Sequence, residues 1–279
     1  MKIGFHEWTT EKKADFLANL KYAGQYGYEC MELLLKNTDA YLETHTIEEM
    51  KKALNDAGVR PSALSALLYF NLLTDENRAE RHGEFERLCK ICEGIGCDTV
   101  ILVASPAHDI KDKEYIHDDA VDELRQYSRI AEKYGVRGAV EFLGFPWASI
   151  NDFKQCYGIV LDAGCENIGI ALDCCHFYCN GSSIDDLKEA DGKRIFAFHI
   201  DDSLEKQIGT YTDDSLRVMP GDGVMPMVEI LAAAREIGID ETPCLELFCE
   251  EIWAWEPEKT FRIGMDKCVA MFEKLSVSS

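Results

Sequence analysis

Short apolar runs alternate with helical patterns about eight times along this chain, and this alternation limits the possible folds more than any other feature. Eight strand and helix units within 279 residues predict one (β/α)₈ barrel domain covering residues 1–279. An open doubly wound sheet is the alternative, but no G-x-G-x-x-G follows the first predicted strand. The predicted strands are Ile3–Trp8, Glu29–Leu35, Pro61–Phe70, Thr99–Ala104, Val136–Leu143, Ile168–Asp173, Ile195–Asp201 and Thr242–Phe248.

One helix has ends that the sequence itself predicts. Between residues 46 and 57, apolar side chains recur with helical spacing, which predicts a helix with one buried face. Thr46 is a suitable N-cap and Gly58 a suitable stop. The apolar positions of this stripe are Ile47, Met50, Leu54 and Ala57.

Four of the predicted strands end in a side chain that can bind a metal, and the residue two positions earlier is small in each. Because side chains alternate along a strand, each pair faces the same side, and the small residue leaves room for an interior site. A buried charge must be paired or metal-bound. We therefore expect these four side chains to meet on one divalent cation, at the strand ends where barrels carry their active sites. The four are Glu141 in GAVEF, Asp173 in GIALD, His199 in FAFHI and Glu246 in CLELF, preceded by Ala139, Ala171, Ala197 and Cys244.

The predicted ligand set favours a catalytic metal. Three carboxylates and one imidazole suit Mn²⁺, which we favour, or Zn²⁺, Co²⁺ or Mg²⁺, and leave positions open for substrate oxygens. A metal that chelates a carbonyl oxygen and the adjacent hydroxyl makes the neighbouring C–H acidic. Glu141 and Glu246 are the candidates to remove and return that proton. This chemistry predicts aldose–ketose isomerisation through a cis-enediol, or epimerisation if the proton returns to the opposite face.

Further residues that follow the strands are candidates to bind the substrate. His176 comes three residues after Asp173, although a lone histidine is often structural. Arg217 offers a planar fork of donors to substrate oxygens; the alternative is a surface arginine paired with Asp213 or Asp214. Aromatic side chains after strand ends either wall the pocket or pack in the core. These are Trp8, Phe70, Trp147 and Trp253.

The turn at residues 220–223, Pro-Gly-Asp-Gly, could resemble a phosphate cradle in the late loops of a barrel. Asp222 lies within it, and its carboxylate would oppose a phosphate. We therefore expect an unphosphorylated substrate.

Charge and composition exclude other classes. A formal net charge of −22 repels nucleic-acid phosphates and anionic lipids, so a small uncharged molecule is the expected partner. No apolar run approaches the roughly 20 residues that span a bilayer, and the N-terminal MKIGFHEW lacks the apolar stretch of a signal peptide, which predicts a cytoplasmic protein. We expect the twelve cysteines to act mainly as small buried hydrophobes, including the Cys89, Cys92 and Cys97 cluster. The sequence is compatible with a homo-oligomer.

The ordered set of these residues resembles the xylose-isomerase-like superfamily of sugar isomerases and epimerases, and within it most closely the inosose isomerases of myo-inositol catabolism. The resemblance covers nearly the whole chain and implies a single barrel with one divalent metal. It also implies that the two glutamates shuttle the proton and that His176 and Arg217 contact the substrate. It rests on Glu141, Asp173-x-x-His176, His199-x-Asp201 and Glu246, and on the segments ALSALLYFN, GVRGAVEFLGFP, ADGKRIFAFHIDD and RVMPGDG.

The chain departs from that family at one point. Where the family pattern has a histidine after the E-x-x-G of the fifth strand, this chain has Phe145, followed by Pro146 and Trp147. The expected reaction is conversion of 2-keto-myo-inositol to 1-keto-D-chiro-inositol. The alternatives are a 3-epimerase acting on fructose, tagatose or psicose, an inosose dehydratase, and a barrel that binds its ligand without turnover. DNA-repair endonucleases share the superfamily, but the charge of −22 and the few histidines disfavour that activity.

Overall fold

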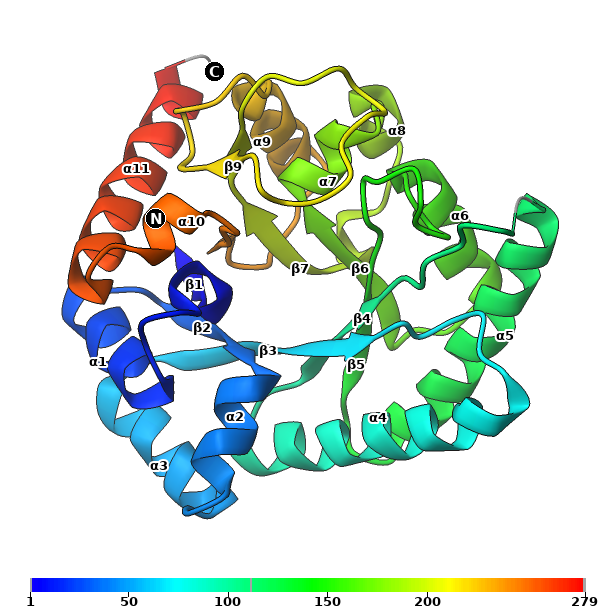
Figure 1. Cartoon of the computed structure of the whole chain (residues 1–279), viewed down its shortest axis with the longest axis horizontal. Helices are drawn as coiled ribbons and strands as arrows, with labels where there is room; N and C mark the ends of the chain where they lie inside the picture. Colours follow the sequence, from blue (N-terminus) through cyan, green and yellow to red (C-terminus); the bar gives the residue numbers. More distant parts are fainter. Residues whose placement is uncertain (1, 111, 278–279) are drawn as a thin grey trace.

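The computed structural model describes residues 2–110 and 112–277, and these form a closed barrel of eight parallel strands (Figure 1). The strands neighbour one another in the order β1-β10-β7-β6-β5-β4-β3-β2, closing between β2 and β1. The predicted fold class is confirmed. The strands are β1 Gly4–His6, β2 Cys30–Leu34, β3 Arg60–Leu68, β4 Thr99–Val103, β5 Arg137–Glu141, β6 Ile168–Asp173, β7 Ile195–Ile200 and β10 Cys244–Leu245.

Helices surround the strands as an outer ring (Figure 1). Their buried apolar side chains belong to the same hydrophobic core as those of the strands. The longer ones are α1 Phe16–Tyr26, α2 Leu35–Leu42, α3 Ile47–Ala57, α4 Asp75–Ile95, α5 Lys113–Glu132, α6 Phe153–Ala163, α9 Met227–Glu236 and α11 Pro257–Val277. The shorter helical segments are α7 Cys174–Cys179, α8 Ile184–Lys188, α10 Glu250–Trp253 and the 3₁₀ turns Glu7–Thr10 and Gly192–Arg194.

Helix α3 confirms the end signals read from the sequence. The Thr46 hydroxyl accepts the Glu49 N–H at 3.2 Å, and the Glu49 carboxylate accepts the Thr46 N–H at 2.8 Å, which is a capping box. Gly58 ends the helix with φ of 67°, a left-handed conformation that glycine adopts without a steric penalty. Met50 and Leu54 of the predicted stripe are buried.

The predicted strands all exist, and their ends differ for local reasons. Strand β3 stops at Leu68 because Tyr69 has φ of 61°, which turns the chain out of the extended conformation. Regular pairing of β10 covers two residues only, although the Glu246 N–H still donates to the Ile200 carbonyl at 3.3 Å. The cysteine expectation also holds, since all twelve are unpaired and ten are buried.

A small antiparallel pair was not predicted from the sequence. β8 (Asp202–Ser203) directly follows the barrel strand β7, and β9 (Arg217–Val218) pairs with it at the end of the loop 204–216. Each strand has two residues, too few to produce an alternating pattern. The pair matters because it returns Arg217 to the barrel mouth.

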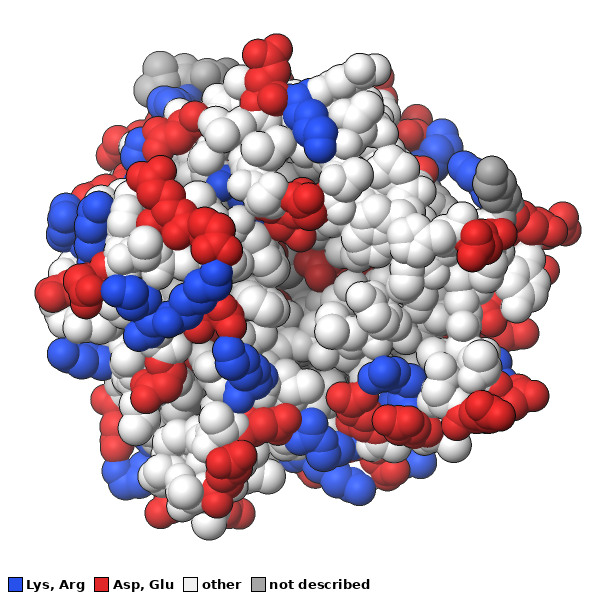
Figure 2. All heavy atoms as spheres, viewed as in Figure 1, with Lys and Arg blue, Asp and Glu red and all other residues white. Residues whose placement is uncertain are grey.

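Acidic and basic side chains are mixed around the mouth of the barrel, and an acidic surface is visible deep in the central hollow (Figure 2). Within the described part of the chain, no helix has both the length and the apolar character needed to cross a membrane.

Candidate metal centre

The four predicted ligands meet inside the barrel mouth. Glu141, Asp173, His199 and Glu246 each offer one ligand atom, and these atoms all lie within 4.8 Å of one another. All four residues are buried. The expected convergence is therefore present in the structure.

Strand register explains why these residues meet. Asp173 at the end of β6 is directly opposite His199 on β7, and His199 is opposite Cys244 on β10. Glu141 ends β5, the strand beside β6. The small residues two positions earlier, Ala139, Ala171, Ala197 and Cys244, are all buried, as expected for same-face neighbours that leave space for the site.

The imidazole of His199 faces carboxylates on its Nδ1 side. Nδ1 lies 3.2 Å from Glu141 Oε1, 3.3 Å from Glu246 Oε2 and 3.8 Å from Asp173 Oδ2. Among the described residues, neither Nδ1 nor Glu141 Oε1 has a properly oriented hydrogen-bond partner. One nitrogen and three carboxylates, buried and incompletely paired, fit a divalent cation.

Without a cation, Glu246 and His199 hold their protons more tightly than usual. Burial raises the pKa of Glu246 to about 7, with Glu141 adding to the rise, although His6, His199 and Arg217 oppose it. Burial alone would lower the pKa of His199, but the Glu32 and Glu246 carboxylates raise it well above its ordinary value. A cation that binds here must therefore displace protons.

Arg217 lies within the site and is fully buried, so it is not a surface arginine. Its Nη1 lies 2.7 Å from Asp173 Oδ2, 2.6 Å from Asp201 Oδ2 and 3.1 Å from Glu246 Oε2. Its Nε donates to Asp214 at 2.8 Å, one of the two partners expected under the alternative interpretation. Despite burial, this cation, with His176 and His199, holds the pKa of Asp173 below its ordinary range.

His176 is brought to the same place by helix α7. The Asp173 carboxylate caps this helix by accepting the His176 backbone N–H at 2.6 Å. Nε2 of the ring lies 3.1 Å from Arg217 Nη2, and an arginine can only donate, so Nε2 accepts and the ring proton lies on Nδ1. Phe145 packs edge-on against this ring at 5.1 Å. Phe145 thus supports His176 from the side.

A cavity of about 180 Å³ reaches two of the four ligands, Glu141 and Glu246. Its polar floor includes Glu141, Glu246, His176 and Arg217. Its walls are largely apolar: Trp8, Leu68, Tyr69, Val103, Leu143, Trp147 and Phe248. This volume is below the roughly 300 Å³ at which pockets for drug-sized ligands begin, so it suits a monosaccharide-sized molecule.

Two of the aromatic residues expected to wall the pocket do not line it. Phe70 is fully buried and packs against Tyr127, because the turn at Tyr69 directs it away from the mouth, so the prediction for Phe70 was wrong. Tyr69 takes that place. Trp253 supports the wall from behind, where its indole N–H donates to the Trp8 carbonyl at 2.7 Å.

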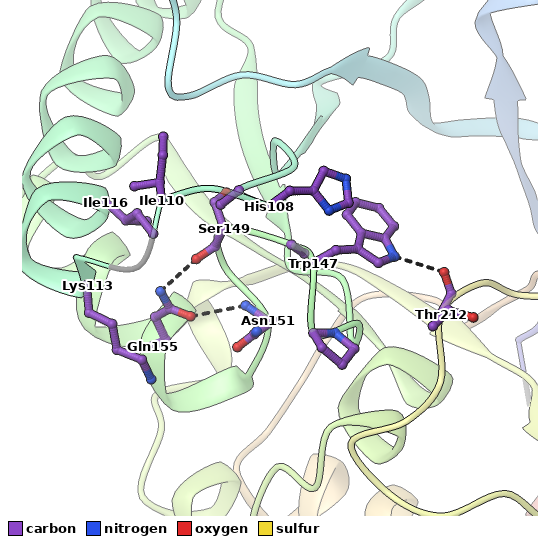
Figure 3. A pocket seen from close by; sticks show the side chains of 12 residues that line it. His108, Ile110, Lys113, Ile116, Trp147, Ser149, Asn151, Gln155 and Thr212 are labelled. Atoms are coloured by element: carbon purple, nitrogen blue, oxygen red, sulfur yellow. Dashed lines mark hydrogen bonds between the residues drawn. The ribbon is translucent and has the colours of Figure 1, made fainter.

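A larger cavity of about 540 Å³ lies on the other side of Trp147 (Figure 3). The Trp147 indole N–H donates to the Thr212 carbonyl at 2.8 Å and so connects the loop after β5 to the loop 204–216. The described residues that line this cavity include His108, Lys113 and Gln155 but no carboxylate. Of these two cavities, the smaller one is therefore the one that Glu141 and Glu246 line.

The glycine turn at residues 220–223 is already occupied by the chain itself. The Asp202 carboxylate accepts backbone N–H groups from Gly221, Gly223 and Met225, each at 3.0 Å. A side chain at Gly223 would collide with this carboxylate and with the Ser203 carbonyl. The expectation of an unphosphorylated substrate gains support, but the responsible residue is Asp202. Asp222 instead turns outward and pairs with Lys267.

Two buried polar residues next to the ligands were missed from the sequence. Glu32 on β2 lies 2.9 Å from His199 Nε2, and His6 at the end of β1 lies 3.2 Å from Glu246 Oε1. The signal that identified the four ligands is present here too, since Gly4 and Cys30 precede them by two positions. Applying it to the first two strands would have found both.

The chain matches the family model described as "Xylose isomerase-like TIM barrel" over residues 20–271. It is 34% identical to the inosose isomerase of Bacillus licheniformis over 275 residues, covering 98% of this chain and 99% of that protein. The inosose isomerase of Bacillus subtilis is similar to the same extent. The D-psicose 3-epimerase of Agrobacterium fabrum is 22% identical over 88% of this chain and 84% of its own.

Solved structures agree with this relationship. A crystal structure of the IOLI protein with a bound zinc atom superposes with a TM-score of 0.95 at 33% identity, covering 99% of both chains. A D-psicose 3-epimerase crystallised in the presence of D-fructose shares the fold, with a TM-score of 0.79 at 18% identity over 99% of both chains. With a matching family model over most of its length and relatives at 34% identity, this chain belongs to the xylose isomerase-like TIM barrel family.

Proposed function

We propose that this protein is a divalent-metal-dependent isomerase that moves the carbonyl of an unphosphorylated cyclitol ketone to the adjacent carbon. The observation that carries the proposal is the incompletely paired His199 Nδ1, which faces three carboxylates, two of which, Glu141 and Glu246, line a small cavity. The substrate we favour is inosose, 2-keto-myo-inositol, converted to 1-keto-D-chiro-inositol. The similarity to inosose isomerases over nearly the whole chain supports this choice.

The residues would divide the chemistry between them. A divalent cation held by Glu141, Asp173, His199 and Glu246 would polarise the substrate carbonyl and the adjacent hydroxyl. One glutamate would take the proton from the carbon that bears this hydroxyl, which leaves a cis-enediolate. The proton then returns to the former carbonyl carbon, and the hydroxyl proton passes to the former carbonyl oxygen, so that the two carbons exchange oxidation states.

The remaining residues of the cavity would hold the substrate. His176 lines the cavity beside Arg217, and we propose that both contact hydroxyl oxygens of the ring. Arg217 also donates to Asp173 and Glu246, so it would fix these carboxylates at the same time. Trp147 would cover one face of the substrate and exclude water from the enediol.

Proton NMR in D₂O tests the reaction and the substrate together. The Mn²⁺-loaded protein is mixed with 2-keto-myo-inositol, and both solvent deuterium incorporation and product are followed. We expect the 1-keto isomer with exchange at the carbon beside the carbonyl. Epimerisation of fructose or tagatose instead would make the protein a ketose 3-epimerase, and loss of water would make it a dehydratase. No reaction with any of these ketones would favour a barrel that binds its ligand without turnover.

We propose Mn²⁺ as the native metal. Zn²⁺, Co²⁺ and Mg²⁺ are the alternatives, because three oxygen ligands and one nitrogen suit these ions as well. Replacing His199 by alanine is expected to remove the bound metal, since it takes away the single nitrogen ligand. Metal content after dialysis, measured by mass spectrometry, is the readout, with His117→Asn at an exposed ion pair as the control. Unchanged stoichiometry in His199→Ala would rule out the site.

Metal affinity is expected to fall as the pH is lowered. Glu246 has a pKa of about 7 in the metal-free protein, and His199 also binds its proton tightly. Below pH 7, the cation must displace these protons, so we expect at least about tenfold weaker Mn²⁺ binding at pH 6 than at pH 8. Competition with a chromophoric chelator, corrected for the chelator's own titration, measures the change. Equal affinity at both pH values would contradict the ligand set.

A further inference from the structure

Four buried side chains form a closed ring beside the metal centre. His6 Nε2 lies 3.2 Å from Glu246 Oε1 and 3.1 Å from Glu32 Oε1. Glu32 Oε2 lies 2.9 Å from His199 Nε2, and His199 Nδ1 lies 3.3 Å from Glu246 Oε2. All four side chains are at most 5% exposed. Two of the four are predicted metal ligands, so the other two contact the ligand set directly.

Barrel topology explains the ring. Strand β1 lies between β2 and β10, and its register places His6 directly opposite Glu32. His6 can therefore reach the carboxylate on one neighbouring strand and Glu246, one residue beyond the other. Glu246 is itself tied to the barrel, because its backbone N–H donates to the Ile200 carbonyl of β7 at 3.3 Å.

When the His6 imidazole is neutral, its single N–H proton has only one available position. Its Nδ1 accepts the Trp8 backbone N–H at 3.0 Å and so carries a lone pair. The N–H must then be on Nε2, which lies between Glu32 and Glu246 and is aligned with neither of them alone. Nε2 therefore faces both carboxylates, at 3.1 Å from Glu32 and 3.2 Å from Glu246, without a well-aligned hydrogen bond to either.

His199 has a complementary requirement. A histidine that binds a metal through Nδ1 has no proton on that atom, so its N–H is on Nε2. Glu32 accepts from this atom at 2.9 Å. Carboxylates in such positions fix the tautomer and the ring orientation of metal-binding histidines.

From these contacts we propose that Glu32 and His6 are positioning residues of the metal centre. Glu32 holds the His199 ring so that Nδ1 points at Glu141, Asp173 and Glu246. His6 holds Glu32 and Glu246 from the opposite side and so fixes which oxygen of Glu246 faces the ligand set. The kinetic part of the following test rests on the proposed function, and the metal-binding part does not.

The first variant is Glu32→Gln, an isosteric change that removes the charge. With metal-free protein and Zn²⁺ as the probe, chelator competition should show about 10- to 100-fold weaker binding. The Co²⁺ absorption spectrum should also change, because the His199 ring is no longer fixed. Glu29→Gln, which removes a half-exposed carboxylate beside β2, is the matched control. A folded Glu32→Gln protein with Zn²⁺ affinity within threefold of the parent and an unchanged Co²⁺ spectrum would overturn the role of Glu32.

The second variant is His6→Asn, which can still cap the Trp8 N–H but no longer reaches Glu246. We expect about tenfold lower kcat with unchanged KM, while Zn²⁺ affinity stays within threefold because Glu32 still orients His199. His117→Asn is the control. Unchanged kcat in His6→Asn would overturn its role. If the parent turns over no ketone, the proposed function fails, whereas the Zn²⁺ measurements on Glu32→Gln still decide the role of Glu32. The Co²⁺ absorption spectrum then decides the role of His6: it should change in His6→Asn, because Glu246 is no longer held, and an unchanged spectrum would overturn that role.

Discussion

Replacing Glu246 by glutamine is expected to lower kcat on 2-keto-myo-inositol by about 10²- to 10⁴-fold, the usual contribution of a general acid–base group. Its carboxylate lines the cavity together with Glu141, where a bound substrate would lie, and a carboxylate there can serve as a general base. Glutamine has nearly the same shape and keeps one oxygen toward the ligand set. The fold and, at saturating Mn²⁺, the metal stoichiometry should therefore be retained.

The measurement combines steady-state kinetics with deuterium exchange in D₂O. Glu251→Gln on the exposed face of α10 is the matched control and should behave as the parent does. If Glu141 removes the first proton, Glu246→Gln will still exchange deuterium into the substrate without forming product. If Glu246 removes it, both signals disappear. A variant with kcat within threefold of the parent would exclude Glu246 from proton transfer.

Replacing Arg217 by methionine is expected to destabilise the metal-free protein by about 3–5 kcal/mol, the cost of removing one partner of a buried ion pair. Methionine fills a similar volume but leaves Asp173, Asp201 and Glu246 without the cation that lies among them. Burial, together with Asp173, already raises the pKa of Asp201 well above its ordinary value. The loss is therefore one of charge compensation more than of packing.

Urea unfolding in the presence of a chelator measures this loss. Arg217→Lys should lose less stability than Arg217→Met, because it keeps the positive charge. It should still be less stable than the parent, because lysine cannot span Asp214 and the deeper carboxylates. Arg262→Met, at an exposed pair with a 4.0 Å separation, should change stability by about 0.5 kcal/mol or less. The deficit of Arg217→Met should shrink as the pH falls from 8 to 5, since the buried carboxylates then bind protons that the unfolded chain does not. Equal stability of Arg217→Met and the parent would contradict the compensating role.

Much of this arrangement could be predicted because the barrel repeats one pattern. Each strand is a short apolar run, and each predicted ligand follows a small residue on the same face, so residues far apart in sequence could be assigned to one site. The positions of Glu141 and His199 followed directly. His6 and Glu32 carry the same pattern, but they lie on strands where no metal ligand was sought.

What could not be predicted depends on backbone geometry that has no periodic signal. The left-handed turn at Tyr69 reverses which aromatic residue faces the cavity, so Phe70 was assigned wrongly. The two-residue strands β8 and β9 bring Arg217 fully inside the site. From the sequence, Arg217 could equally be a surface residue, because nothing in the loop 204–216 indicates where it returns.

The carboxylate of Asp202 accepts three backbone N–H groups of the glycine turn. It therefore occupies the donors that a phosphate would need in order to bind there. A tethered group competes at an effective concentration of about millimolar or higher, so a free phosphate would have to displace it. The enzyme should consequently be insensitive to inorganic phosphate and to phosphorylated sugars at cellular levels. The Asp202 side chain is thus expected to keep this barrel from binding the phosphorylated metabolites that phosphate-binding barrels accept.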